Sequence, residues 1–247
     1  LYEQTIFGED IDGDGTSGKN FNALTTVNTD TIGDVLLKDS DGSFFIKTTA
    51  DQYIPISEPW GGSARFDYSD SWYGGSSSAV AVAVEDTTYT NSSGTSVSGY
   101  VVAIRNTFTD SNNQTETDWN LRFIDSKGVI DQGNSPWIRN IQTKESLFDH
   151  DGTQADLDLD GKYGFQAAEL TAITSDNTGD LLKRDDGYAL YIIDDQGTSS
   201  TDDDVTISIV DNYGGTPVFN HSHSGGSGDY AYSHVSEAYA VESFSDS

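Results

Sequence analysis

The chain has 247 residues, of which 41 are acidic and 12 basic, so its formal net charge is −29 at pH 7. This charge excludes nucleic acid and an anionic membrane surface as partners, because both require Lys- and Arg-rich surfaces. The chain contains no Cys, which excludes thiolate zinc sites and a thiol nucleophile. Hydrophobic residues make up 34% and aromatics 11%, so we expect a thin core that a bound cation would help to hold together.

The first motif is DIDGDGTSG at residues 10–18. Carboxylates at loop positions 1, 3 and 5 converge on one cation, and a Gly at position 6 permits the tight turn between them. Asp10, Asp12 and Asp14 fill these positions, with Gly15 at the turn and the Thr16 carbonyl as a further ligand. Because calcium prefers hard oxygen ligands at this density, the motif predicts a Ca²⁺ site.

The middle of the chain predicts strands. Residues 79–87, 99–108 and 117–125 are rich in β-branched and aromatic residues or alternate apolar with polar ones over a strand length. Asp-Gly and Lys-Gly pairs between such runs indicate hairpin turns. One short helix is expected near 165–173, and no βαβ alternation is visible, so we do not expect a Rossmann or barrel-type α/β enzyme fold.

A second motif, DLDLDGKYG, occupies residues 156–164. Asp156, Asp158 and Asp160 take the three carboxylate positions, and Gly161 and Lys162 take the positions of the turn and the carbonyl ligand. In a complete EF-hand loop, position 12 carries a bidentate Glu.

Position 12 of the two motifs is Phe21 and Ala167, so another carboxylate must complete each site. The nearby acidic candidates are Glu3, Glu9, Asp34, Asp180 and, for the second loop, Glu169.

The two motifs mark an internal repeat. The offset between them is 146 residues, and the run from Thr29 matches the run from Ser175 at that offset with a one-residue slip. Further on, PWGGSARFDYS matches NYGGTPVFNHS at an offset of 153, and AVAVE ending at Glu85 matches AYAVE ending at Glu242. We therefore predict a first calcium-loop module at residues 1–145 and a second, incomplete copy at 146–247.

The incomplete copy and the start of the chain lead to two further expectations. The second copy stops before the strands that follow Glu85 in the first, so they are expected to be cut away or to come from a neighbouring chain by strand addition. The chain begins at Leu1 rather than Met and has no visible signal peptide or membrane-spanning run. We expect a processed chain or a segment of a larger one.

Other residues have simpler structural explanations. The H-x-H pair His221 and His223 favours a solvated loop over a metal site, because the first copy has no equivalent. Glu85 and Glu242 are expected to be buried hydrogen-bonding residues or additional cation ligands, not a catalytic pair. All four Trp residues lie in the first copy, where core or interface positions are expected and sugar stacking is the alternative.

The order of these elements resembles tandem calcium-binding repeats of large bacterial secreted and cell-surface proteins, of the cyanobacterial type. The loops themselves resemble those of dockerins and of thrombospondin-type repeats. The resemblance implies two tandem β-sandwich-like modules in an all-β fold, with EF-hand-like calcium loops and at most short helices. The implied protein is not an enzyme but a secreted structural one, a cell-surface adhesin or self-assembling filament whose partners are neighbouring repeats and possible glycans. A carbohydrate-binding module or an accessory domain of a secreted hydrolase is the alternative.

Overall fold

The computed structural model describes residues 19–27, 33–91, 93–164, 170–173, 181–184, 190–194, 205–210, 221–225 and 232–236. Within these residues the protein is built from antiparallel sheets, and its helices are 3₁₀ turns of three or four residues. The predicted all-β class is therefore confirmed. The helix expected at 165–173 falls partly outside the described residues, and its end does not extend a helix, because Thr171–Ala172 forms strand β10.

A small four-stranded sheet follows the 3₁₀ turn η2 (Phe21–Ala23). Its strands pair antiparallel in the order β1-β2-β3-β4. They are β1 (Thr25–Thr26), β2 (Val35–Lys38), β3 (Phe44–Lys47) and β4 (Tyr53–Pro55).

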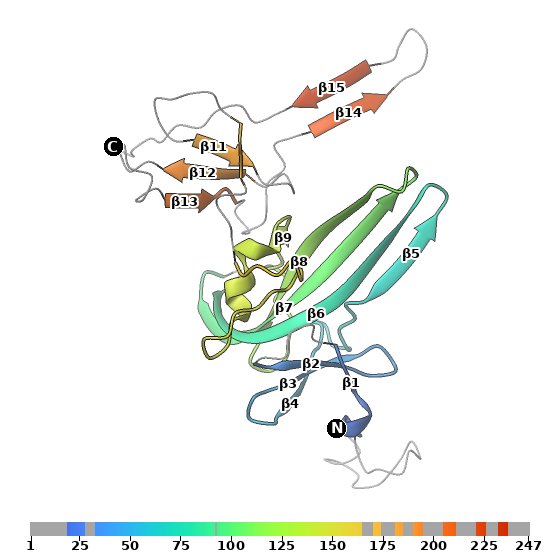
Figure 1. Ribbon diagram of the computed structural model, residues 1–247. Coiled ribbons are helices and arrows are strands. Elements are labelled where there is room, and N and C mark those ends of the chain that lie inside the picture. Colours follow the sequence, from blue (N-terminus) through green and yellow to red (C-terminus); the bar gives the residue numbers. More distant parts are fainter. Residues whose placement is uncertain are drawn as a thin grey trace.

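A five-stranded antiparallel sheet with two very long strands forms the centre of the molecule (Figure 1). Its strands are β5 (Tyr68–Trp72), β6 (Gly75–Thr90), β7 (Ser96–Asp110), β8 (Thr115–Asp125) and β9 (Trp137–Ile138). Short turns join β5 through β8, so each strand pairs with the next along the chain.

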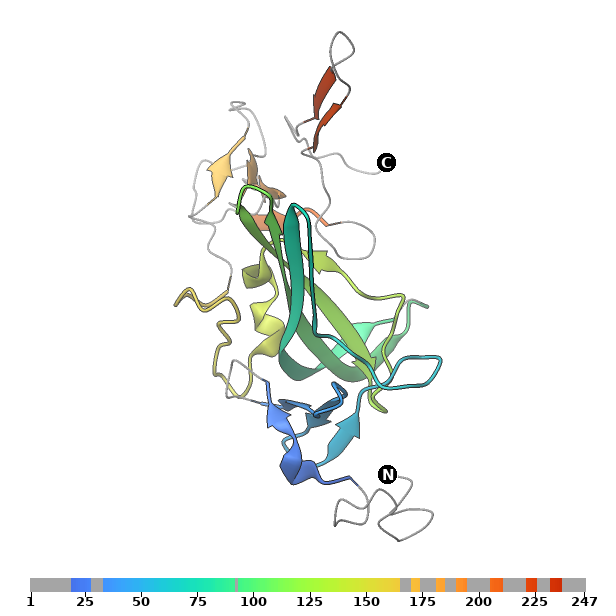
Figure 2. The same ribbon diagram turned by 90° about the vertical axis from the view of Figure 1, so that its right-hand side faces the viewer.

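The two faces of the five-stranded sheet bury two separate cores. One face packs against β2 and β3, where Leu36 and Ile46 meet Val102 and Ile124. The other face packs against the 3₁₀ turns η3 (Ile141–Thr143) and η4 (Glu145–Phe148) and the loop that follows them. Strand residues alternate between faces, and Figure 2 shows the two layers on either side of the long strands.

A bulge in β6 fits this strand to both cores. The register against β7 shifts between Ala81 and Ala83. As a result, Val82 and Ala83 both belong to the second core, while Ala81 and Val84 belong to the first. A bulge inserts one residue and bends the strand, so the apolar run of β6 supplies both layers without strict alternation.

The strand pairing of the first sheet recurs later in the chain. The strands β10 (Thr171–Ala172), β11 (Leu181–Arg184), β12 (Leu190–Asp194) and β13 (Val205–Ser208) form a sheet of the same order. Thr25 pairs with Lys38 and Thr171 pairs with Arg184, both at an offset of 146. The offset holds through β11 and β12, so the one-residue slip expected from the letters does not occur.

The later offsets are reproduced as well. Ile46 pairs with Ile54 in the first sheet, and Ile192 pairs with Ile207 in its repeat. Ile192 follows Ile46 by 146 residues, whereas Ile207 in the last strand follows Ile54 by 153 residues. The hairpin of β14 (His221–Gly225) and β15 (Tyr232–Ser236) corresponds to the hairpin of β5 and β6. Its first strand, β14, follows β5 at an offset of 153 residues. The repeat of the sequence is therefore also a repeat of register.

Among the described residues, no helix has the length and apolar character needed to cross a membrane.

Candidate metal centre

The second motif lies in a loop that the central sheet holds in place. Asn140 caps η3 by accepting a hydrogen bond from Gln142 N through its side chain at 2.9 Å. Phe148 at the end of η4 and Leu157 inside the motif are buried in the second core, 1% and 0% exposed. Because both ends of this segment are anchored, the acidic positions of the motif have defined places beside η4.

Three carboxylates converge at this point. Glu145, Asp156 and Asp158 each present an oxygen, and these oxygens lie within 4.8 Å of one another. The turn is tight because Leu159 and Gly161 adopt positive φ angles of 63° and 81°, a region that Gly occupies without strain. Three hard oxygens at this spacing match the chemistry that Ca²⁺ prefers.

The loop wraps its backbone around the first aspartate. Asp156 accepts hydrogen bonds from Asp160 N at 3.2 Å and from Gly161 N at 3.0 Å. Asp160 does not belong to the group of three carboxylates; its side chain accepts hydrogen bonds from Gln142 Nε2 at 2.7 Å and from Lys162 N at 2.8 Å. The structure thus brings together two of the three predicted aspartates.

Glu145 is the central residue of the cluster. Its side chain is 1% exposed, and its two oxygens accept hydrogen bonds from Leu157 N at 2.8 Å and Gly164 N at 2.9 Å. Burial raises the pKa of Glu145, and the charges of Asp158 and Asp156 raise it further. Burial likewise raises the pKa of Asp158. A divalent cation would relieve this repulsion and favour the ionised form of all three groups.

The sequence did not identify Glu145, which lies eleven residues before the motif. A weak signal was available in the repeat: upstream of the two motifs, Ile6-Phe7 matches Leu147-Phe148 in sequence, and this match places Glu145 opposite Gln4, which is next to Glu3. Glu3 is one of the candidates expected to complete the first loop.

The first motif lies outside the part of the chain that the structure describes. Asp10, Asp12, Asp14 and Thr16 lie outside the described residues, as do the candidate carboxylates Glu3, Glu9, Glu169 and Asp180. Asp34 is described, and it lies in a different group of ionisable residues.

This second group surrounds Glu85 on β6, which is 3% exposed. Its Oε2 accepts a hydrogen bond from Asp34 N at 3.2 Å, and its Oε1 lies 2.9 Å from Nδ1 of His150. Ligand atoms of Glu85, Asp86 and His150 lie within 4.8 Å of one another. Glu85 therefore connects the central sheet to the chain entering β2 and to the loop that follows η4.

Burial raises the pKa of Glu85 to about 7. Burial acts to lower the pKa of His150, but the carboxylates of Glu85, Asp151 and Asp86 together raise it. The two groups form a hydrogen-bonded pair whose charges depend on pH near neutrality. Since Glu85 is occupied by protein partners, its position matches the buried hydrogen-bonding residue expected from the sequence.

In comparisons with protein-family models, with curated proteins and with solved structures, nothing was found that matches this chain.

Proposed function

We propose that the chain is a calcium-stabilised structural segment of a secreted, non-enzymatic protein, an adhesin or self-assembling filament of the cell surface. Its modules are β-sandwich-like and each opens with a calcium loop. Neighbouring repeats of the same protein are its partners. The work of the cation is mechanical, since it fixes the junction at which one module follows the other.

The observation that carries this proposal is the Glu145, Asp156 and Asp158 cluster. It lies where the chain leaves the central sheet and where the second copy of the repeat begins. A cation bound there would link η4 to the motif and so hold the second copy against the core of the first. Because an ion that binds only the folded state stabilises it by mass action, binding at 100 times Kd adds about 2.7 kcal/mol.

The surroundings of the cluster favour a structural ion over a catalytic one. Both oxygens of Glu145 are held by backbone N–H groups, and Leu157 between the two aspartates is fully buried. Catalytic metal sites keep an open position for substrate beside their ligands, whereas here the loop backbone encloses its first ligand. The packing of β2 and β3 on the central sheet supports the sandwich-like arrangement.

The proposal is tested by thermal unfolding with Ca²⁺ and with excess chelator. Each Ca²⁺ that binds at 100 times its Kd is expected to raise the melting temperature by about 5–10 °C, given about 2–4 °C per kcal/mol for a chain of this size. Titration calorimetry should find two bound ions. The double variant D156N/D158N should bind one ion and lose part of the thermal shift.

A matched control removes the same charge elsewhere. Asp51 and Glu116 are exposed and lie outside both acidic groups, so D51N/E116Q should keep both ions and the whole shift. Equal melting temperatures with and without Ca²⁺ would contradict the proposal, and so would an unchanged ion count in D156N/D158N.

A further inference from the structure

The face of the central sheet that packs against β2 and β3 also carries a pocket of about 240 Å³, which lies beside the first core. Its apolar lining comes from Phe66, Ala79 and Ile104. Its polar lining is formed by side chains with amide, carboxylate or guanidinium groups: Glu58, Arg65, Asn106, Asn120, Arg122 and Gln132. The volume is below the roughly 300–1,000 Å³ of sites for drug-sized ligands, so it suits one compact ring.

The strand register brings these residues together. Tyr68 pairs with Ala79, which pairs with Asn106 across β5, β6 and β7. In the next row, Asn120 stands between Ile104 and Trp137. Paired residues of neighbouring strands point to the same side of a sheet, so the pocket has a rigid wall that exists before any ligand arrives.

Two of the polar groups are fixed in position. Gln132 Nε2 donates to Glu58 Oε2 at 3.0 Å, and Arg122 Nη1 donates to Ser135 Oγ at 2.8 Å. These bonds hold the side chains but leave further N–H donors on Arg122 and both a donor and the Oε1 acceptor on Gln132. A ligand with several hydroxyl groups can therefore bind without first ordering the pocket.

Asn120 supplies the observation that points to a ligand. The residue is 3% exposed, and its Nδ2 donates to the carbonyls of Ser135 and Pro136, both at 3.2 Å. Its Oδ1 is buried and has no hydrogen-bond partner among the described residues. Since an unsatisfied buried acceptor costs about 1–3 kcal/mol, a donor reaching this atom from the pocket would be favoured.

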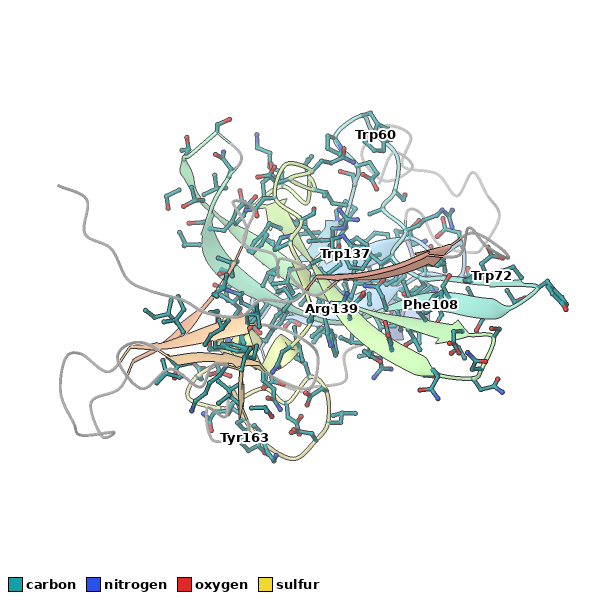
Figure 3. The ribbon with its side chains drawn as sticks, turned by 90° about the horizontal axis from the view of Figure 1, so that it is seen from above. Trp60, Trp72, Phe108, Trp137, Arg139 and Tyr163 are labelled. Atoms are coloured by element: carbon teal, nitrogen blue, oxygen red, sulfur yellow. The ribbon has the colours of Figure 1, made fainter. Side chains whose placement is uncertain are left out.

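An aromatic surface completes the site. Trp137 and Tyr68 line the pocket although they are 54% and 53% exposed. Trp137 belongs to β9, and Figure 3 shows it near the centre of the view, apart from Trp60. A half-exposed Trp beside fixed polar groups offers a flat apolar face together with directed hydrogen bonds.

We propose that this pocket binds one ring of a neutral saccharide. Trp137 covers the apolar C–H face of the ring, and Gln132, Arg122 and Asn120 bind its hydroxyl groups. Each hydroxyl both donates and accepts, which matches the mixed amide and guanidinium lining. The neutral class follows from charge, because the carboxylate of Glu58 lines the pocket together with the guanidinium of Arg122, and because a net charge of −29 repels polyanionic glycans.

The test is titration calorimetry of the full chain in the presence of Ca²⁺. The probes are cellohexaose, xylohexaose, mannohexaose and maltohexaose, with an oligogalacturonate as the acidic probe. At least one neutral probe is expected to bind. Trp137→Ala and Gln132→Ala should each weaken that binding by about tenfold or more.

Trp60→Ala is the matched control, because Trp60 is 72% exposed and does not line the pocket. It should bind as the unchanged protein does, and all three variants should keep the same melting temperature. Failure of every neutral probe to bind would overturn the inference. Binding confined to the oligogalacturonate, or unaffected by Trp137→Ala, would also overturn it.

Discussion

Several buried side chains of this protein hold backbone groups in place. Glu145 accepts two backbone N–H groups of the acidic loop, and Glu85 accepts one from the chain entering β2. Asn120 does the converse by donating to two carbonyls. Such bonds position segments that lack regular structure, because a buried carboxylate or amide that lost its partner would cost free energy.

Gly33 shows how closely one of these side chains is enclosed. Its φ is +66°, and a Cβ at this position would lie 1.7 Å from Oε2 of Glu85. Gly33→Ala is expected to lower the free energy of unfolding by about 2–4 kcal/mol, from backbone strain and displacement of Glu85. Chemical denaturation measures the change.

Gly94→Ala provides the comparison. Gly94 has a φ of +77° but open space where a Cβ would stand, so only backbone strain of about 1 kcal/mol is expected. Equal decreases in the free energy of unfolding of the two variants would show that displacement of Glu85 does not contribute to the effect of Gly33→Ala.

At the scale of elements, β6 connects most of the molecule. It pairs with β5 and β7, contributes to both cores through its bulge, and carries Glu85 at the point where the sheet meets His150. The contact between Glu85 and His150 therefore joins the central sheet to the segment that leads into the second motif.

This contact predicts a pH dependence. The pKa of Glu85 is raised from 4.5 to about 7, so the folded state binds its proton more tightly than the unfolded state does. That contribution is present at low pH and is lost as pH rises from about 4.5 to 7. The raised pKa of His150 acts in the same direction, since its contribution is lost as pH rises above its ordinary value of 6.5.

In chelator, the free energy of unfolding is expected to fall between pH 5 and pH 8, and Glu85→Gln should reduce this fall by about 1 kcal/mol. Chemical denaturation at each pH measures the free energy of unfolding. Glu116→Gln, which removes an exposed carboxylate on β8, should retain the original slope. Parallel curves for Glu85→Gln and the unchanged protein would be inconsistent with this role.

At the scale of the whole molecule, 41 acidic and 12 basic residues leave a charge of −29. Self-repulsion at this charge opposes compaction and is screened by salt. The acidic clusters concentrate part of this cost at the junction between the copies, where a bound cation would act most strongly.

Raising NaCl from about 10 mM to 500 mM should therefore increase the melting temperature, because the Debye length falls from about 30 Å to a few ångströms. The increase should be larger in chelator than with bound Ca²⁺, since calcium has already neutralised part of the charge. Differential scanning fluorimetry gives both values. A melting temperature that falls with added NaCl would contradict the expectation.

The sequence by itself determined the β class, the repeat and its offsets of 146 and 153. These are local properties, because strand propensity and turn residues act over a few positions and a duplicated segment keeps its pairing. The prediction from sequence was wrong where VLLK and LLKR suggested a slip, which the pairing of Thr171 with Arg184 excludes. It was also wrong at the end of the helix expected at 165–173, because Thr171–Ala172 forms strand β10.

The tertiary structure alone decided which side chains meet. Glu145 joins Asp156 and Asp158 because η4 packs on the central sheet, and Glu85 meets His150 across 65 residues of chain. The residues that line the pocket, which include Glu58 and Trp137, likewise come from several strands and loops. Such meetings depend on packing between distant segments, which no local pattern of residues encodes.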